Sequence, residues 1–468
     1  MGSYVMHKSI PLLLFLALLL AACSSAGEQV AVLSADQEDA ELESASDPAA
    51  ETTETAEQDA TDSALMQDVE AAEDAGTPAP GTFNGQPLST LEDGSTCGFG
   101  DELEADSIVV DQIPGDGRDP SIASALSDQD NDDFPEPLVD TSRIISGGPP
   151  PDGIPPINEP KFQTASTVDW LRCNEPVLSL SIDGDARAYP VQVMTWHELV
   201  NDTFDDLPVT VSFCPLCNSA LAYNRDLGDR VVTFGTSGRL FNSSLVMYDR
   251  ETESLWTHFN GAAVVGELAG VELELLPMQT LSWASFLQQN PDGLVLNRDT
   301  GFDRSYGSNP YSGYDNVETD PILFDQEADP RLPAKERVVG IRRADDNAAI
   351  VLSGLAEAGV LETVVGGDTL TLWHLQGTSS ALETSRIADG RDIGSVGVFL
   401  PAADGQALTF SRSADGSFED AETGSTWNIQ GIATAGALQG EMLEQVEHLD
   451  TFWFAVAAFE PDTRIVAR

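Results

Sequence analysis

Short stretches of this 468-residue chain recur in the same order about 160 to 170 residues further along. The matching pairs are SAL at 219–221 and 380–382, ETESLW at 251–256 and ETGSTW at 422–427, GELAG at 266–270 and GALQG at 436–440, and WASFLQQNP at 283–291 and WFAVAAFEP at 453–461. Chance matches would not keep a common order, and such a period is typical of repeated structural units. We therefore predict two tandem copies of one unit, the first over 146–335 with a connector at about 295–335, and the second over 336–468.

Within each copy, short apolar strands should outnumber helices. Strands are expected at 177–182, 208–213 and 231–235, and helices at 190–200 and 280–289. Pro190 suits a first helical turn, and Thr280 or Ser282 can cap the second helix. Tight turns rich in Gly, Asp and Asn favour antiparallel pairing. The predicted fold class is a β-rich α+β fold, in which each copy is a mixed, mainly antiparallel unit of strands and helices.

The N-terminus has the pattern of a bacterial lipoprotein signal. Lys8 precedes an apolar run at 10–20 that is too short to span a bilayer but fits a signal peptide. The run closes on LAAC, which places small residues before Cys23. We therefore expect residues 1–23 to be the signal peptide with its lipobox and Cys23 to carry lipid. That anchor alone should hold the exported chain at the cell envelope, on the periplasmic or extracellular face.

The chain is strongly acidic, with a formal net charge of −56 and only three lysines. Such a surface repels phosphate backbones, so we expect no nucleic-acid partner. Much of the excess charge lies in 24–145, where Ala, Glu, Asp, Thr and Ser are frequent and aromatic residues are few. A segment of this composition buries too little apolar surface to offset its chain entropy, so we expect an acidic disordered stalk there.

Export also determines what the other four cysteines can do, because disulfides persist outside the cytoplasm. Cys214 and Cys217 form a Cys-Pro-Leu-Cys motif, which leaves Cys97 and Cys173 as the remaining thiols. We predict that Cys97 and Cys173 join in a disulfide.

The Cys-Pro-Leu-Cys motif ends a β-like run and follows His197 in the stretch WHELVND at 196–202. Two thiolates on one turn can face a soft metal ion, copper or zinc, with an imidazole as a further ligand. We therefore predict a metal site of Cys214, Cys217 and His197, and these are also the candidates if the site is catalytic. Alternatively, the thiols cycle between dithiol and disulfide, or one of them is a nucleophile with His197 as its base.

A static disulfide or a tight turn is the structural alternative for Cys214 and Cys217. At the register of the two SAL matches, Leu375 and Thr378 take their places in the second copy. A unit that folds with those residues does not require cysteines for its turn, which favours a chemical role.

Several longer motifs carry a resemblance to a known family. They are TWHELVNDT at 195–203, CPLCNSA at 214–220, FGTSGRLFNSSLVMYDRETESLW at 234–256 and TGFDRSYGSNPYSGYDN at 300–316. In these motifs the chain resembles the prokaryotic family of uncharacterised proteins catalogued as domain of unknown function 3179. The resemblance implies that the Trp-His-Glu and Cys-Pro-x-Cys stretches belong to the family pattern, whereas Cys97 and Cys173 are particular to this chain. It implies no activity.

We therefore expect an exported lipoprotein with a soft-metal or thiol-redox centre built on Cys214, Cys217 and His197. The alternative is a non-enzymatic envelope protein that binds a ligand between the two copies, with a structural disulfide or turn at the same cysteines.

Overall fold

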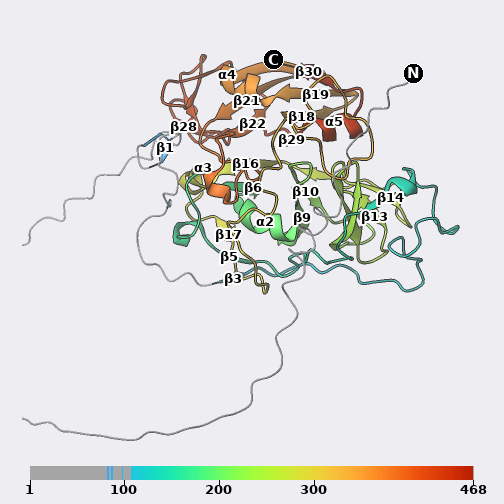
Figure 1. Cartoon of the computed structure of the whole chain (residues 1–468). Coiled ribbons are helices and arrows are strands. Elements are labelled where there is room, and N and C mark those ends of the chain that lie inside the picture. Colours follow the sequence, from blue (N-terminus) through green and yellow to red (C-terminus); the bar gives the residue numbers. More distant parts are fainter. Residues whose placement is uncertain (1–81, 84–85, 88–96, 98–106, 467–468) are drawn as a thin grey trace, which may run out of the picture. The chain divides into compact units, whose positions relative to one another are not determined.

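The computed structural model describes residues 82–83, 86–87, 97 and 107–466, which belong to one compact unit (Figure 1). The predicted signal peptide, Cys23 and most of the predicted stalk lie outside these residues. In the part of the chain that is described, no helix is long and apolar enough to cross a membrane. The same part has four α-helices among many short strands, so the fold is α+β and rich in β-structure, as predicted.

The first sheet of the N-terminal half has the order β16-β6-β7-β17-β5-β3. Its strands are β3 (Ile108–Val109), β5 (Lys161–Thr164), β6 (Pro176–Ile182), β7 (Asp185–Pro190), β16 (Met278–Ser282) and β17 (Leu294–Leu296). Neighbouring strands are antiparallel except for β7 and β17, which are parallel. Helix α2 (Val191–His197) follows β7, and helix α3 (Trp283–Gln289) follows β16.

Beside the two-stranded pair β1 (Thr82–Phe83) and β2 (Gln86–Pro87), this half has two larger sheets, the first of which carries the Cys-Pro-Leu-Cys motif. One has the order β15-β10-β9-β8, from strands β8 (Leu199–Phe204), β9 (Leu207–Cys214), β10 (Ser219–Asn224) and β15 (Leu275–Leu276). The other has the order β14-β13-β12-β11-β4, from strands β4 (Ile145–Ser146), β11 (Phe234–Phe241), β12 (Ser244–Asp249), β13 (Leu255–Thr257) and β14 (Ala262–Val265). Both sheets contribute to one apolar core, including Val209, Val211, Leu221, Leu245, Met247 and Trp256.

The C-terminal half begins with a sheet of order β29-β18-β19-β30, from strands β18 (Arg337–Arg343), β19 (Asp346–Val351), β29 (Leu449–Phe452) and β30 (Arg464–Val466). Its neighbours are antiparallel except for β19 and β30, which are parallel. Helix α4 (Leu352–Ala358) follows β19 and helix α5 (Trp453–Phe459) follows β29. A second sheet consists of β20 (Val360–Val365), β21 (Asp368–Leu375) and β22 (Ser395–Phe399), and a third of β25 (Phe410–Arg412), β26 (Phe418–Asp420), β27 (Thr426–Trp427) and β28 (Ala433–Ala435). Strands β23 (Ala402–Ala403) and β24 (Gln406–Ala407) form a two-stranded sheet.

The helix predicted over 190–200 is shorter than the sequence pattern indicated. It ends at His197, and Glu198 takes a left-handed φ of 60° as the chain turns into β8. Leu199 and Val200, which fitted a helical apolar face, pair with β9 instead. Pairing with a long buried strand satisfies their backbone groups and buries their side chains in the same step.

Two other expectations are corrected in the same way. The helix predicted over 280–289 begins only at Trp283, because 278–282 forms strand β16. The SAL stretch at 219–221 lies in β10, whereas the SAL stretch at 380–382 lies in the loop before β22. Those two stretches therefore do not occupy corresponding strands.

The segment 107–145, which the sequence placed in the stalk, packs against the N-terminal half. Strand β3 pairs with β5, and Gln112 Nε2 donates a hydrogen bond to Asp202 Oδ1 at 3.2 Å. Further along, Leu138 N donates to Val264 O at 2.9 Å. The prediction of a disordered stalk is therefore wrong over this segment, because its backbone and side chains complete sheets of the folded part.

Cys97 and Cys173, the pair predicted from the sequence, are joined in a disulfide with their Cα atoms 4.9 Å apart. Both are buried in a core that contains Trp283, whose indole N–H donates to the carbonyl of Cys97 at 3.1 Å. The bond links positions separated by 76 residues.

Candidate functional site: a buried dithiol beside a histidine

The Cys-Pro-Leu-Cys motif forms the turn between β9 and β10. Cys214 ends β9 and lies opposite Ser219, the first residue of β10. The turn is closed by a hydrogen bond of 3.3 Å from Asn218 N to Pro215 O, and Asn218 takes a left-handed φ of 50° that Asn adopts more readily than most residues. Cys214 and Cys217 are free thiols, and their exposed fractions are 2% and 0%.

A chain of hydrogen bonds leads from the thiol of Cys217 to His258, the residue after β13. Cys217 Sγ lies 2.9 Å from Ser219 Oγ, which lies 2.8 Å from His258 Nε2. On the other side of the ring, Nδ1 lies 2.8 Å from Ser212 Oγ, and Ser212 Oγ donates to Leu221 O at 3.2 Å. Because that hydroxyl proton points to the carbonyl, Nδ1 carries the ring proton and Nε2 accepts from Ser219. Cys217 thus has a proton acceptor two hydrogen bonds away.

The two thiols differ in acidity. Burial raises the pKa of Cys214, and its hydrogen bond to Cys217 raises it further. Burial also disfavours the thiolate of Cys217, but hydrogen bonds with Cys214, Ser219 and Ser244 outweigh burial, so the pKa of Cys217 is lowered. The pKa of His258 is lowered by burial, which keeps the ring neutral, so that one ring nitrogen can accept a hydrogen bond. Cys217 is therefore the thiol that ionises first.

Cys214 is held by groups of a different kind. The backbone N–H of Leu245 in β12 donates to Cys214 Sγ at 3.4 Å. Glu198 is 7% exposed, and its pKa is raised by burial and by the charge of Cys214. The carboxyl group of Glu198 is thus held as a neutral acid near this thiol.

His197 is not part of the thiol cluster. Its Nδ1 lies 2.7 Å from Pro155 O and its Nε2 lies 2.7 Å from Tyr306 OH, so both ring nitrogens have partners away from the sulfurs. The predicted site of Cys214, Cys217 and His197 is therefore not assembled. Within 107–466 and the few other described positions, no group of three or more His, Cys, Asp or Glu side chains is arranged to hold a metal ion.

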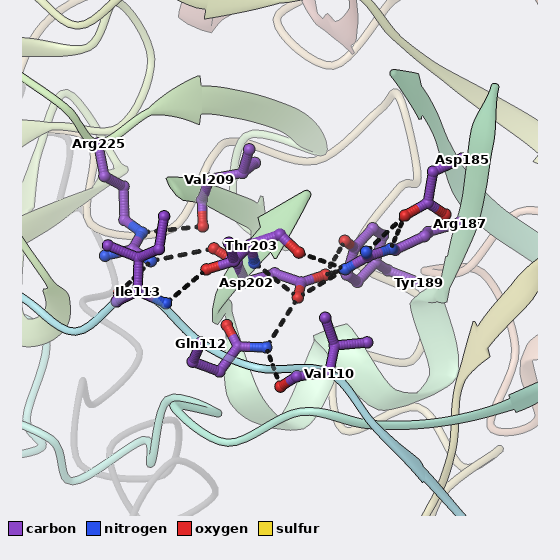
Figure 2. Close-up of polar contacts among 10 residues, drawn as sticks. All are labelled: Val110, Gln112, Ile113, Asp185, Arg187, Tyr189, Asp202, Thr203, Val209 and Arg225. Carbon is purple, nitrogen blue, oxygen red and sulfur yellow. Dashed lines mark hydrogen bonds and ion pairs between the residues drawn. The ribbon is translucent and has the colours of Figure 1, made fainter. Parts of the chain in front are cut away.

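The end of the WHELVND stretch belongs to a buried ion cluster (Figure 2). Arg187 Nη1 donates to both carboxylate oxygens of Asp202 at 2.8 Å, and Tyr189 OH donates to Asp202 Oδ2 at 2.5 Å. Arg225 donates to backbone carbonyls, among them those of Asp202 and Val209, both at 3.0 Å. The buried charges of Arg187 and Asp202 are paired, so the cluster joins β7 to β8, and Arg225 joins β8 to β9.

The sequence contained an indirect signal for His258, which lies in the serines of three buried strands. Ser212, Ser219 and Ser244 are polar residues on buried strands that are otherwise mostly apolar. Serines at such positions need hydrogen-bond partners inside the core, and a buried histidine can serve two of them. Finding which histidine does so requires knowing that the sheet of β9 and β10 packs on the sheet of β12 and β13.

A cavity of about 40 Å³ lies between the two halves. It is lined by Phe213 and Ala220, which alternate along β9 and β10 with Cys214 and Ser219 and so face the opposite side of the sheet. Arg337 and Asp450 also line the cavity, and Arg337 Nε and Asp450 Oδ1 are buried without a hydrogen-bond partner among the described residues.

Comparison with known proteins gives one match. The sequence model of a family described as "Protein of unknown function (DUF3179)" matches residues 151–463. No curated protein and no solved structure matches the chain.

Proposed function

The chain belongs to the DUF3179 family, whose function is unknown, and we propose from its site that it is an exported lipoprotein with a thiol-redox centre. In this proposal Cys214 and Cys217 cycle between dithiol and disulfide, with Cys217 as the attacking thiol. The observation that carries the proposal is the pair of free, buried thiols on one turn, with Cys217 joined through Ser219 to His258; the lowered pKa of Cys217 agrees with it. A cysteine that only fills an apolar core has a raised pKa instead.

The hydrogen-bond chain supplies the proton transfer that thiol–disulfide exchange requires. Exchange begins when a thiolate attacks a disulfide sulfur. As Cys217 ionises, its proton passes to the hydroxyl of Ser219, and the hydroxyl proton of Ser219 passes to His258 Nε2. His258 then acts as the proton acceptor, because its Nδ1 is held protonated against Ser212.

We also propose that the two halves are copies of one unit, as the sequence repeats predict. The sheets β16-β6-β7-β17 and β29-β18-β19-β30 share one strand order and one set of pairing directions, which supports this proposal. A shared turn supports it as well: Trp256 Nε1 donates to Asp249 and Trp427 Nε1 donates to Asp420, both at 2.9 Å.

In this correspondence, the second half has the scaffold without the thiol cluster. Strands β9 and β21 both have eight residues. The first residue of β10 is a serine that pairs with the last residue of β9, and the first residue of β22 is a serine that pairs with the last residue of β21. The corresponding pairs are Ser212 and Trp373, Cys214 and Leu375, Cys217 and Thr378, Ser219 and Ser395, and His258 and Ile429. A scaffold that folds with Leu375, Thr378 and Ile429 at these positions does not need two cysteines and a histidine, which favours a chemical role for them.

An extracytoplasmic location agrees with the disulfide between Cys97 and Cys173, because such bonds are rare in the cytosol. It also agrees with the signal-peptide pattern before Cys23, which would leave lipid as the attachment to the membrane. Both disulfides and thiols occur in that compartment, so the dithiol could exchange with either of them.

Copper(I) binding is the second use that the same thiols support, because thiolates select this ion. Both ring nitrogens of His258 contact serine hydroxyls, so two sulfurs form the available donor set. Structural zinc takes four ligands, and the donor set therefore fits copper(I) better than zinc.

The redox proposal is tested by equilibrating the full chain with mixtures of reduced and oxidised dithiothreitol. The samples are quenched in acid and alkylated after denaturation, and mass spectrometry then counts the free thiols. We expect Cys214 and Cys217 to lose their thiols together at one potential, and Cys214→Ser and Cys217→Ser each to keep one thiol throughout. A pair that stays reduced at every potential would contradict the redox proposal. Copper bound at one ion per chain, and lost in Cys217→Ser, would support the copper proposal.

The cavity between the halves favours ligand binding as a second candidate function. Arg337 Nε can donate to a ligand and Asp450 Oδ1 can exchange a hydrogen bond with it, and a buried polar atom without a partner is unfavourable until one is supplied. The other lining residues are mostly apolar, so a small carboxylate or amide, such as acetate or acetamide, is a suitable probe for these two polar groups. Thermal stabilisation by either probe that disappears in Asp450→Ala would support this function, and an equal shift in both proteins would contradict it.

A further inference from the structure

The connector between the two halves has no regular structure of its own. Strand β17 ends at Leu296 and β18 begins at Arg337, and no helix or strand is found in the described residues between them. Loops of more than about 15 residues without secondary structure are uncommon in compact domains and are usually functional, for example as lids.

The connector contacts both of the motifs that the sequence singled out. Tyr306 OH lies 2.7 Å from His197 Nε2, and Tyr314 OH donates to Leu216 O, in the cysteine turn, at 2.8 Å. Most of the connector is exposed or half-buried, but Tyr314 is only 6% exposed. Its ring lies close enough to the dithiol that the charges of Cys214 and Cys217 contribute to its raised pKa, although burial is the main cause.

Another residue of the connector, Lys335, holds Tyr314 in place. Lys335 Nζ donates to Tyr314 O at 2.6 Å and lies 4.5 Å from the centre of the Tyr314 ring. The far side of the cysteine turn is closed by β29, where Phe452 N and Thr451 Oγ1 donate to Cys217 O at 3.1 and 2.8 Å. The turn is thus enclosed between the connector and a strand of the other half.

This enclosure limits what can reach the sulfurs. A cysteine of a protein partner brings its own backbone and neighbouring side chains to the attacked sulfur, so it needs an open surface around the thiol. A disulfide of a few atoms needs only a narrow opening. Strand β29 belongs to a sheet and is fixed by its pairing with β18. The connector beside the cysteine turn is held by fewer bonds: Gly313 N and Tyr314 N donate to the carbonyls of Glu383 and Leu382 at 2.6 and 3.1 Å, and Tyr314 OH donates to the turn itself.

Building on the proposed redox function, we propose that the dithiol reacts with low-molecular-weight disulfides and not with protein disulfides. The connector 297–336 is the gate that admits them, and Tyr314 is its latch. Cys217 thiolate attacks one sulfur of RSSR, forms a mixed disulfide and releases one RS⁻, which takes up a proton as RSH. Cys214 then attacks Cys217 Sγ, releases the second RSH, and leaves the protein with a Cys214–Cys217 disulfide.

The test compares rates of oxidation by bis(2-hydroxyethyl) disulfide and by a small protein with one exposed, redox-active disulfide. Tyr314→Phe keeps the ring but removes the hydrogen bond to Leu216 O, so oxidation by the small disulfide should be about fivefold faster, as expected for the loss of one net hydrogen bond. Tyr248→Phe removes a tyrosine hydrogen bond to Asp152 outside the connector, so it is the matched control and should leave the rate unchanged. Oxidation by the protein disulfide should be at least a hundredfold slower in all three proteins.

An equal rate with the protein disulfide, or no rate change in Tyr314→Phe, would overturn the gate. The equilibrium redox titration described above separates this failure from failure of the redox centre. If Cys214 and Cys217 oxidise at equilibrium but Tyr314→Phe does not change the rate, the redox function is supported and the gate is contradicted. If the two thiols never oxidise, both proposals are contradicted.

Discussion

At the scale of single residues, His197 and Glu175 respond to pH in opposite senses. Burial lowers the pKa of His197 to about 4 and raises the pKa of Glu175 to about 7. Each group is therefore neutral in the folded protein over a pH range in which it is charged in the unfolded chain. The two contributions to the free energy of unfolding can be separated by substitution.

Replacing His197 by Gln should flatten the rise of stability with pH. Between about pH 4 and 6.5 the unfolded chain binds a proton at His197 that the folded protein does not, so His197 makes the free energy of unfolding increase with pH. This contribution is complete above pH 6.5 and is lost as the pH falls towards 4, and it amounts to about 3 kcal/mol. Urea unfolding across this range should therefore show a smaller slope in the variant. An unchanged slope would contradict a neutral, buried imidazole.

Replacing Glu175 by Gln should steepen the same rise. Between about pH 4.5 and 7 the folded protein retains a proton that the unfolded chain has lost, so Glu175 makes the free energy of unfolding decrease as the pH rises. Glutamine cannot ionise, and it can still accept the hydrogen bond from Gln192. The urea series should give a larger slope than the wild type, and an unchanged slope would show that Glu175 ionises normally.

Ser219 should tune the acidity of Cys217, because its hydrogen bond is one of those that lower the pKa of this thiol. In Ser219→Ala the pH profile of Cys217 oxidation by a small disulfide should move to higher pH. Ser395→Ala removes the corresponding serine of the second half, which contacts Thr378, and serves as the control with an unchanged profile. A shift of equal size in both variants would indicate a general change in stability.

The sequence predicted two of the residues in the thiol cluster and missed the histidine. Cys214 and Cys217 were recognisable from their spacing on a turn, which local geometry determines. His197 was chosen because it is near in sequence, but the end of α2 directs its ring to Pro155 and Tyr306. His258 reaches the serines through the packing of two sheets, and no local pattern contains that information.

At the scale of elements, the strands were predicted better than the ends of the helices. β6 and β9 lie where alternating and β-branched residues indicated them. The helix over 190–200 was extended too far, because an apolar face at Leu199 and Val200 suits a helix and a buried strand alike. Leu199 and Val200 belong to a strand because β9, the next strand of the hairpin, pairs with them through backbone hydrogen bonds.

The turns that end at Trp256 and Trp427 provide a matched test of the proposed repeat. Asp249 accepts hydrogen bonds from Thr252 N, Ser254 N and Trp256 Nε1 at 2.6, 3.1 and 2.9 Å. Asp420 accepts the same set in the second half, and both aspartates are fully buried. Asp249→Ala and Asp420→Ala leave these buried donors without a partner, so each should lower the free energy of unfolding by about 2 to 4 kcal/mol. Denaturant unfolding that shows a loss in only one variant would contradict equivalent turns.

At the scale of the whole molecule, the disulfide joins residue 97 to the core around Trp283. Replacing Cys97 and Cys173 together by Ser should lower the free energy of unfolding by roughly 4 kcal/mol, because the bond closes a long loop in the unfolded chain. The thiol count and the redox potential of Cys214 and Cys217 should stay the same, since that pair lies in a separate core. A changed potential would show that the two sites are coupled.

The extent of the folded part was the least predictable feature at this scale. The acidic composition of 107–145 indicated a stalk, yet Ile113 N donates to Thr203 Oγ1 and the carbonyl of Leu126 accepts from Arg239. A count of charges along the chain does not reveal partners about a hundred positions away. The acidic side chains of this segment face water, while its backbone completes the fold.

The separation of the disulfide from the dithiol has a consequence for how the protein matures. Four cysteines can be paired in three ways, and only one of these keeps Cys97 with Cys173 and Cys214 with Cys217. Once β9 and β10 have packed, Cys214 and Cys217 are enclosed and can no longer form a disulfide with Cys97 or Cys173. Mispairing is therefore possible only while the hairpin is still open, so the speed at which β9 and β10 pack, relative to the speed of oxidation, sets the yield of correctly bonded chains.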